Sequence, residues 1–237
     1  MKTENLQFED ALREISANFP DDLVKFVCAP ASKKLRPRLI FAVLEALELP
    51  VASRQMKIAL AVEILHSATL IHDDIIDESP TRRGELSFYE KYGAKKSVIL
   101  GDYLLSIVMK LLVQINSMRV LEIFSDNILK ICEGEFMSPS DENYVEKITK
   151  KTALLFVCAV SSSLEVANVE NEKRKNLEDF ALNYGIAFQI KDDIDDCERD
   201  GVYASMKKEF IERAKTNLEF IEPNKRHLLT AFLDDLE

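Results

Sequence analysis

The stretch from about residue 54 to residue 77 constrains the fold most, because it is apolar on most faces of a helix and yet ends in acids. Its apolar part, residues 58–71, reads IALAVEILHSATLI. Asp73, Asp74 and Asp77 follow at its end, arranged as DDxxD. A helix that is apolar nearly all round belongs at the centre of a bundle. The sequence therefore predicts a central helix with negative charge gathered at one end.

The remainder of the chain also has helical periodicity. Only 6 glycines and 7 prolines occur among 237 residues, which is too few for the frequent turns of a β-rich protein. No repeat and no linker divides the chain, so an all-α multi-helix bundle in one domain, residues 1–237, is expected without any strand. Besides a first amphipathic helix around residues 6–15, helices are expected at roughly 38–49, 54–77, 95–116, 118–136, 142–168, 171–196, 203–221 and 225–236.

Composition limits the class of protein, its ligands and its cellular location. Hydrophobic residues make up 47% and charged residues 30%, as in a globular protein, and the net charge of −10 argues against non-specific nucleic-acid binding. The four cysteines lack metal-ligand spacing and are expected to be free thiols. The N-terminus has no apolar signal core, and no uninterrupted apolar run approaches the ~20 residues of a membrane span. A cytoplasmic protein without stable membrane insertion is expected.

A second acid cluster repeats the first far away in the sequence. FQIKDDIDD supplies Asp192, Asp193 and Asp196, again as DDxxD at the end of a long helix. One such cluster in an acidic protein is more often a solvated helix end. Acids at a helix C-terminus are nevertheless opposed by the helix dipole and by their own repulsion, so stability does not explain two of them. Carboxylates at i and i+4 share a helix face, and hard cations such as Mg²⁺ prefer oxygen ligands. The pair of clusters favours a magnesium site that binds a diphosphate.

Basic segments accompany the acids, as a phosphate site requires. They are ASKKLRPR at 31–38, TRRG at 81–84, and KITKKTALLF with Lys147, Lys150 and Lys151. Each segment alone is compatible with ordinary surface charge. Arg82 and Arg83, however, follow the first acid cluster closely, and guanidinium groups pair well with phosphate oxygens.

Together these residues resemble the trans-type polyprenyl diphosphate synthases, and most closely their long-chain members. Five motifs occur in the family's order along most of the chain. They are KKLRP, LHSATLIHDDIIDESPTRRG, KYGAKKSVILGDYLLS, KTALLF and GIAFQIKDDIDD. The resemblance implies the isoprenoid synthase fold with a central apolar cavity, a homodimer in which the helix around 95–116 contributes to the interface, and several Mg²⁺ ions, roughly three once substrate is bound.

The resemblance also implies roles for individual residues. Those expected to act in catalysis are Asp73, Asp74, Asp77, Arg82, Lys151 and Asp192. The Mg²⁺ ligands would be Asp73, Asp74, Asp77, Asp192, Asp193 and Asp196. Arg82 and Lys151, with Thr152 and Gln189 close by, would bind the allylic diphosphate, and Lys33, Arg36, His66 and Arg83 would bind isopentenyl diphosphate. The diphosphate would leave, the isopentenyl double bond would attack the allylic cation, and a proton would pass to pyrophosphate.

Product length is expected to depend on the helix just before Asp73. Ala68 and Thr69 lie about 6–7 Å below it along the helix, and both are small. In the family a bulky aromatic residue at this place tends to stop elongation early. The resemblance therefore implies a product longer than farnesyl diphosphate.

The chain departs from the family pattern in several places. Ala31 and Ser32 replace the usual glycines, Lys34 stands where arginine is common, and Ser138 replaces an expected glutamine. The lysine-containing segment after the second acid cluster is reduced to CERDGVYASMKKEF, so the synthase-like domain is expected to be shortened near its C-terminus. Two other functions stay open: a non-catalytic or weakly active partner subunit of a synthase, and a class I terpene cyclase, which would not need an isopentenyl pocket.

Overall fold

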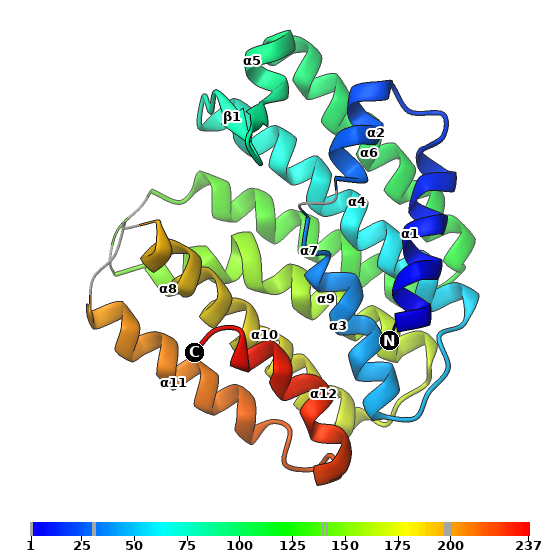
Figure 1. Cartoon of the computed structure of the whole chain (residues 1–237), viewed down its shortest axis with the longest axis vertical. Coiled ribbons are helices and arrows are strands. Elements are labelled where there is room, and N and C mark those ends of the chain that lie inside the picture. Colours follow the sequence, from blue (N-terminus) through cyan, green and yellow to red (C-terminus); the bar gives the residue numbers. More distant parts are fainter. Residues whose placement is uncertain (1, 30–31, 139, 141, 197–200) are drawn as a thin grey trace. The chain divides into compact units, whose positions relative to one another are not determined.

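The protein is described by a computed structural model that covers residues 2–29, 32–138, 140, 142–196 and 201–237 (Figure 1). The described residues form α-helices, one π-helical turn and one very short hairpin, which confirms the all-α fold class. Their contacts group the chain into two compact units, Met1–Arg38 with Ser53–Asn116 and Leu39–Ala52 with Ser117–Glu237. Whether these units form the single expected domain stays a prediction.

The first unit is organised around α4 (Ser53–Ile76), the predicted central helix. Buried side chains occur on most of its faces, including Ile58, Val62, Leu65 and Ile71. The helices α1 (Lys2–Ser16), α2 (Asp21–Val27), α5 (Phe88–Tyr92) and α6 (Ala94–Ile115) all contact α4. The central position expected from the all-round apolar sequence is therefore confirmed within this unit.

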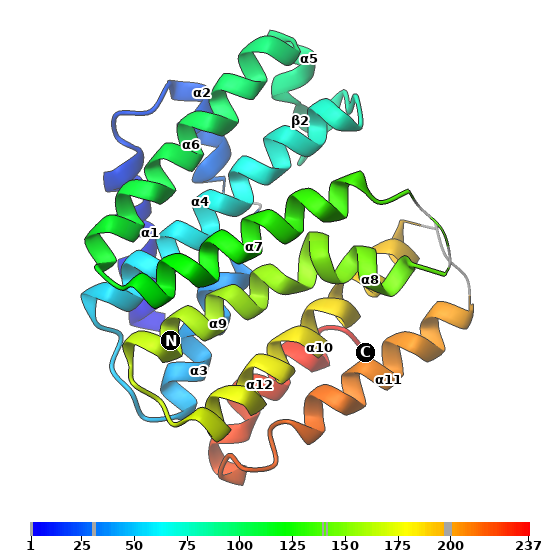
Figure 2. The same ribbon diagram turned by 180° about the vertical axis from the view of Figure 1, so that it is seen from behind.

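Helix α6 packs along α4, and the two can be followed side by side in Figure 2. Gly101 permits the approach, because a Cβ atom at this position would lie 2.1 Å from Nε2 of His72 on α4. Gly101 of the motif KYGAKKSVILGDYLLS therefore has a packing role, because it gives space to the ring of His72, immediately before the first acid cluster.

The irregular connection after α4 is a hairpin, which the sequence analysis did not anticipate. The strands β1 (Thr81–Arg82) and β2 (Glu85–Leu86) pair antiparallel, with Arg82 opposite Glu85. The two residues of the turn, Arg83 and Gly84, have φ angles of 55° and 81°. Two positive φ angles are the signature of a type I′ turn, which matches the natural twist of a hairpin. The expectation of no strand is wrong for these few residues.

The second unit contains most of α3 (Leu35–Ala46) and the chain from α7 (Met118–Phe136) onward. Its further elements are α8 (Tyr144–Ile148), the π-helical turn η1 (Thr149–Ala153), α9 (Leu154–Val166), α10 (Asn171–Asp195), α11 (Gly201–Thr216) and α12 (Pro223–Asp234). Helix α10 contacts α9, η1 and α11. The core of the second unit centres on Tyr184. Its ring contacts Phe156, Phe180 and Phe232 at centroid distances of 5.1, 6.3 and 5.7 Å.

The predicted helix boundaries agree with the structure to within a few residues, with three differences. Helix α3 begins at Leu35, before Pro37, because proline is tolerated in the first helical turn. The predicted helix 142–168 is divided by η1. The short helices α2 and α5 were missed, since seven and five residues are too few to show a helical period.

Helix α6 is long enough and apolar enough to cross a membrane by length and composition alone, and 33% of its apolar stretch is buried in the structure. Polar residues such as Asp102 and Lys110 interrupt its apolar sequence, and the absence of stable membrane insertion stays a prediction. One face of α6 carries the buried residues Leu104, Val108 and Leu111, whereas Ile99 and Val113 are 67% and 75% exposed. The helix therefore has a second apolar face that the described residues leave uncovered.

Candidate active site

The first acid cluster lies at the C-terminal end of α4, where the apolar helix reaches the protein surface. Asp77 is exposed and Asp73 is half-buried, and both belong to one i, i+4 face. Asp74, in contrast, has no exposed surface. The cluster thus separates into two carboxylates accessible to a ligand and one that is held inside the unit.

Arg82 compensates the buried carboxylate. Its Nε donates to Oδ1 of Asp74 at 2.8 Å, and its Nη2 lies 2.5 Å from the same oxygen. Burial raises the pKa of Asp74, and the hydrogen bond and charge of Arg82 oppose that rise. Arg82 lies on β1, directly before the type I′ turn, and its ion pair with Asp74 joins the hairpin to the acid cluster.

Arg83 turns toward residues 32–34, the basic loop, which precede α3. Its Nη1 donates to the carbonyl of Phe26 at 3.1 Å, its Nη2 donates to Oγ of Ser32 at 3.4 Å, and its guanidinium lies 5.1 Å from the centroid of the Phe26 ring. Two arginines adjacent in sequence therefore have separate partners. Arg82 belongs to the acid cluster, and Arg83 belongs to the predicted isopentenyl pocket.

The basic loop is anchored by a buried ion pair that the sequence analysis missed. Nζ of Lys34 lies 3.2 Å from Oε1 of Glu63 on α4, with exposed fractions of 6% and 1%. Lys33, which was expected to bind substrate, is exposed, and Arg36 is buried. A signal for Glu63 existed in the sequence, because a single glutamate in the apolar run IALAVEILH needs a buried partner.

His66 lies on α4 among several positive charges. Burial lowers its pKa well below the usual value, and the charges of Arg36, Arg83, Lys34 and Arg82 lower it further. The imidazole is therefore neutral at neutral pH. Arg36 and Arg83, two of the residues predicted to bind isopentenyl diphosphate, thus act electrostatically on His66, a third.

The two predicted chain-length residues differ in exposure. Ala68 has no exposed surface, whereas Thr69 is partly exposed and donates its hydroxyl to the carbonyl of His66 at 2.9 Å. Thr69 also lies four residues before Asp73, on the same helix face as Asp73 and Asp77. Of the two, Thr69 is better placed to line a substrate channel.

The second acid cluster, on α10, is held by a chain of hydrogen bonds within the second unit. Thr152 donates to Oε1 of Gln189 at 2.7 Å, and Nε2 of Gln189 donates to Oδ1 of Asp193 at 2.8 Å. Tyr144, which the sequence analysis missed, donates its hydroxyl to Oδ2 of Asp193 at 2.6 Å. Both carboxylate oxygens of Asp193 are therefore oriented, whereas Asp196 is exposed at the end of the helix.

The predicted Lys-Thr motif forms the π-helical turn η1, with Lys151 paired to Glu135 at 2.8 Å. Two glycines allow this turn to pack. A Cβ at Gly134 of α7 would lie 2.9 Å from Cβ of Lys150, and a Cβ at Gly185 of α10 would lie 2.7 Å from Cα of Ala153. Single π-turns are frequent at functional sites. Here the turn places Lys151 and Thr152 against α7 and α10.

The carboxylates have the donor chemistry that Mg²⁺ requires. Asp73 and Asp77 supply hard oxygens at a helix end, and Oδ2 of Asp74 is buried without a hydrogen-bond partner. Among the described residues, no three carboxylate, imidazole or thiolate groups are arranged to hold a metal by themselves. Mg²⁺ is usually held by one or two carboxylates, with substrate phosphates and water completing its shell, so the residues fit such an ion.

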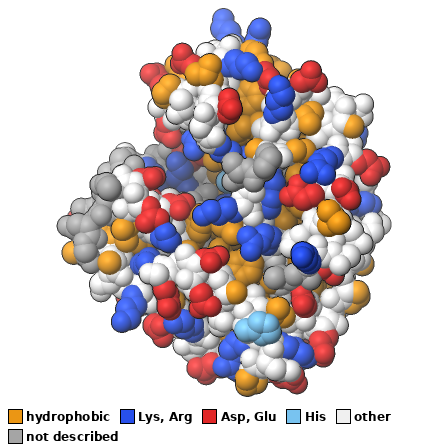
Figure 3. Space-filling view, viewed as in Figure 1, with side chains coloured by type: hydrophobic (Ala, Val, Ile, Leu, Met, Phe, Trp, Pro, Cys, Tyr) orange, Lys and Arg blue, Asp and Glu red, His pale blue; other side chains and the backbone are white. Residues whose placement is uncertain are grey.

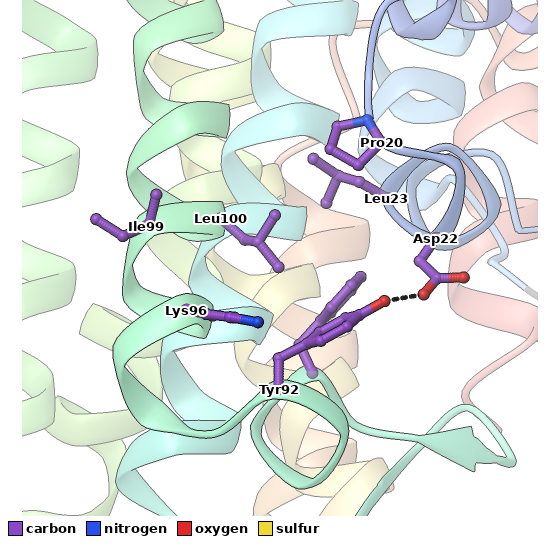
Figure 4. A pocket seen from close by; sticks show the side chains of 8 residues that line it. Pro20, Asp22, Leu23, Tyr92, Lys96, Ile99 and Leu100 are labelled. Carbon is purple, nitrogen blue, oxygen red and sulfur yellow. Dashed lines mark hydrogen bonds between the residues drawn. The ribbon is translucent and has the colours of Figure 1, made fainter.

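A pocket and a buried thiol are two further features of the described residues, and neither involves a predicted site residue. A pocket of about 370 Å³ in the first unit is lined by Leu23, Phe88, Tyr92, Lys96 and Ile99 among others, and it contains no predicted site residue (Figure 4). Burial raises the pKa of the Cys158 thiol to about 12, which makes it a poor nucleophile. The face seen in Figure 3 mixes acidic and basic side chains.

The sequence profile of the polyprenyl synthetase family matches residues 20–217, which is most of the chain and includes every predicted site residue. The chain belongs to the polyprenyl synthetase family. An octaprenyl diphosphate synthase from Escherichia coli strain K12 is 32% identical over 184 residues, or 74% of this chain and 57% of that protein. A short chain isoprenyl diphosphate synthase from Methanocaldococcus jannaschii is 32% identical over 181 residues, or 72% and 55%. The chain thus spans little more than half the length of these curated relatives.

Solved structures support the same fold. A polyprenyl synthase from Caulobacter crescentus CB15, complexed with calcium and isoprenyl diphosphate, superposes with a TM-score of 0.86 at 23% identity, over 99% of this chain and 94% of that chain. In this polyprenyl synthetase the first acid cluster with its cations and the second with its hydrogen-bond chain each assemble within one unit. The approach of the two clusters across the units stays a prediction.

Gly185→Ala is expected to destabilise the protein by about 2–3 kcal/mol, because the new methyl group would meet backbone at Ala153 and force α10 away from η1. Urea unfolding measures the loss. Glu172→Ala, on the exposed side of the same helix, is the control and should change the unfolding free energy by less than about 0.5 kcal/mol. Equal stability of the two variants would show that α10 does not pack closely against the π-turn.

The stability of the protein is expected to fall as pH decreases below about 6.5, in part because of His66. The folded state resists protonation of this imidazole, whereas the unfolded chain takes up the proton, so acid favours unfolding. Between about pH 6 and pH 5, His66→Gln should reduce the slope of unfolding free energy against pH by up to about 1.4 kcal/mol per pH unit. Urea titrations at several pH values provide the comparison. Parallel curves for both proteins would mean that His66 titrates normally.

Proposed function

We propose that this polyprenyl synthetase is a Mg²⁺-dependent trans-prenyltransferase. It condenses isopentenyl diphosphate with an allylic diphosphate, releases pyrophosphate and gives a product longer than farnesyl diphosphate. Family membership and the names of the relatives support this activity. Because the chain spans only part of those relatives, the proposal rests on the residues of its own site.

The observation that carries the proposal is that Lys34 and Arg82 pair with buried carboxylates of α4 and Arg83 donates to Ser32, so three cations are fixed close to the helix that carries the accessible carboxylates Asp73 and Asp77. Such a concentration of positive charge inside a net acidic protein suits a polyanion. Diphosphate is the polyanion that also recruits Mg²⁺ to neighbouring aspartates. A terpene cyclase, with one diphosphate to bind, would not need this second cationic group.

The chain's own residues can perform the steps of the condensation. Lys151 and Arg82 would bind the allylic diphosphate, with Arg82 oriented by Asp74 and Lys151 by the π-turn. Mg²⁺ held by Asp73, Asp77 and the second cluster would neutralise the charge that develops on the leaving group. Arg83, Arg36 and Lys33 would hold isopentenyl diphosphate so that its double bond attacks the allylic carbon. The proton lost from the new chain would pass to pyrophosphate.

A homodimer is part of the proposal. The uncovered face of α6 carries Val98, Ile99, Met109 and Val113, with exposed fractions of 43%, 67%, 48% and 75%. Apolar faces of this length on a helix are usually covered by another protein surface or by lipid. A second copy of the chain would cover it symmetrically.

Activity is tested with purified protein, Mg²⁺, labelled isopentenyl diphosphate and a set of allylic primers. Chain extension with release of pyrophosphate is expected. Asp73→Asn should lower kcat/KM by about 10²–10³-fold, since it removes a carboxylate that would hold Mg²⁺ at the leaving diphosphate. Asp179→Asn removes a carboxylate that pairs with Lys175 on the surface, and it should retain activity. Binding of isopentenyl diphosphate without turnover would instead favour the partner-subunit function.

Product length is tested by aromatic substitutions on α4. Thr69→Phe should shorten the product ladder, because Thr69 shares the accessible face of Asp73, and Ala68→Phe should shorten it as well if the buried position can accept the ring. Thin-layer chromatography of the dephosphorylated products gives the readout. Unchanged ladders from two folded, active variants would contradict a channel along this part of α4.

A further inference from the structure

Glu63 is a buried carboxylate on α4 for which neither the family motifs nor the proposed mechanism provides a role. It is 1% exposed and lies three residues before His66, within one turn of the same helix. Buried carboxylates are rare unless they are paired. Its partners therefore indicate what it does.

Both partners of Glu63 come from the basic loop. Oε1 of Glu63 lies 3.2 Å from Nζ of Lys34 and accepts a hydrogen bond from Oγ of Ser32, also at 3.2 Å. Nζ of Lys34 donates in addition to the carbonyl of Val27 at 2.5 Å. One carboxylate thus ties the loop to the central helix and, through Lys34, to the end of α2.

Lys34 determines where α3 begins. Its carbonyl accepts the backbone hydrogen bond from Arg38, and α3 starts at the next residue, Leu35. Its φ angle is +48°, a left-handed conformation that lysine rarely adopts and that surrounding contacts must maintain. Because Lys33 precedes it and Arg36 lies in the first turn of α3, the anchored lysine sets the positions of both predicted ligands.

Ser32 extends the same network to the hairpin. Its hydroxyl accepts a hydrogen bond from Nη2 of Arg83 at 3.4 Å while it donates to Glu63. A glycine at this position, as in the family motif, could make neither contact. Burial lowers the pKa of Arg83, and the negative charge of Glu63 opposes that shift, in agreement with their proximity.

We infer that Glu63 is a positioning residue for the isopentenyl diphosphate site, which acts through Lys34 and Ser32 to hold Lys33, Arg36 and Arg83 in place before substrate arrives. This inference rests on the proposed function. Glu63 does not bind the substrate itself, since a carboxylate would repel a diphosphate. A pair that only stabilised the fold would affect unfolding but not the affinity for one particular substrate.

The test compares Glu63→Gln with wild type in steady-state kinetics, varying each substrate separately. The amide keeps the size of the side chain and removes the charge that fixes Lys34. We expect KM for isopentenyl diphosphate to rise about 10-fold or more, with kcat and KM for the allylic diphosphate within about 3-fold of wild type.

Two further comparisons separate positioning from stability. Glu165→Gln breaks a partly buried ion pair with Arg174 in the second unit and should lower thermal stability without changing either KM. In a Lys34→Met background, Glu63→Gln should raise KM for isopentenyl diphosphate less than it does in wild type, because the two residues act in series. Full additivity, or an equal rise in both KM values, would overturn the inference.

Calorimetric titration with isopentenyl diphosphate alone distinguishes failure of the inference from failure of the proposed function. Weaker binding by Glu63→Gln than by wild type supports the positioning role even if neither protein turns over. Equal affinities contradict that role even if wild type is an active synthase. Absence of turnover with intact binding contradicts only the prenyltransferase activity.

Discussion

The ion pair between Asp74 and Arg82 is the interaction on which the first unit's predicted site depends. A carboxylate with no exposed surface at the end of an apolar helix is costly unless a fixed opposite charge accompanies it. Arg82 provides that charge from β1, the strand that leads into the turn at Arg83 and Gly84. The same turn directs Arg83 toward Phe26 and Ser32. One compensated charge thereby aligns two cationic groups with different partners.

Glu63 is a second buried carboxylate that is paired with a cation. Both carboxylates are on α4, both are almost completely buried, and each is paired with a cation from a separate connecting segment. Since either carboxylate alone would be an uncompensated buried charge, the loop and the hairpin are coupled to α4. Desolvation also keeps His66 neutral among these cations. A preorganised set of positive charges is what a diphosphate site needs, because the charges need not be assembled when substrate binds.

In the second unit close packing, more than charge, positions the predicted groups. Gly134 and Gly185 let α7 and α10 approach the π-turn, and that turn places Thr152 within hydrogen-bond reach of Gln189. Gln189 and Tyr144 then orient Asp193 from two sides. The deepest part of this unit is aromatic, with Tyr184 and Phe156 in an edge-on contact next to the turn. The acid cluster on α10 therefore has a rigid support.

The sequence by itself determined the helical architecture, the central place of α4 and the family. These depend on local periodicity, on the spacing of carboxylates one turn apart, and on motifs read in order. Only the tertiary structure decided that Asp74 is buried and Asp77 is not, that Lys34 rather than Lys33 is the anchored residue, and that Tyr144 reaches Asp193. The last pair is separated by 49 residues, and Lys34 by 29 residues from Glu63. Periodicity reports which face of a helix is apolar, but it carries no information about which distant side chain meets a buried charge. The partner of a buried charge is determined by tertiary packing, which places a charge, a glycine or a hydroxyl against a residue of another element.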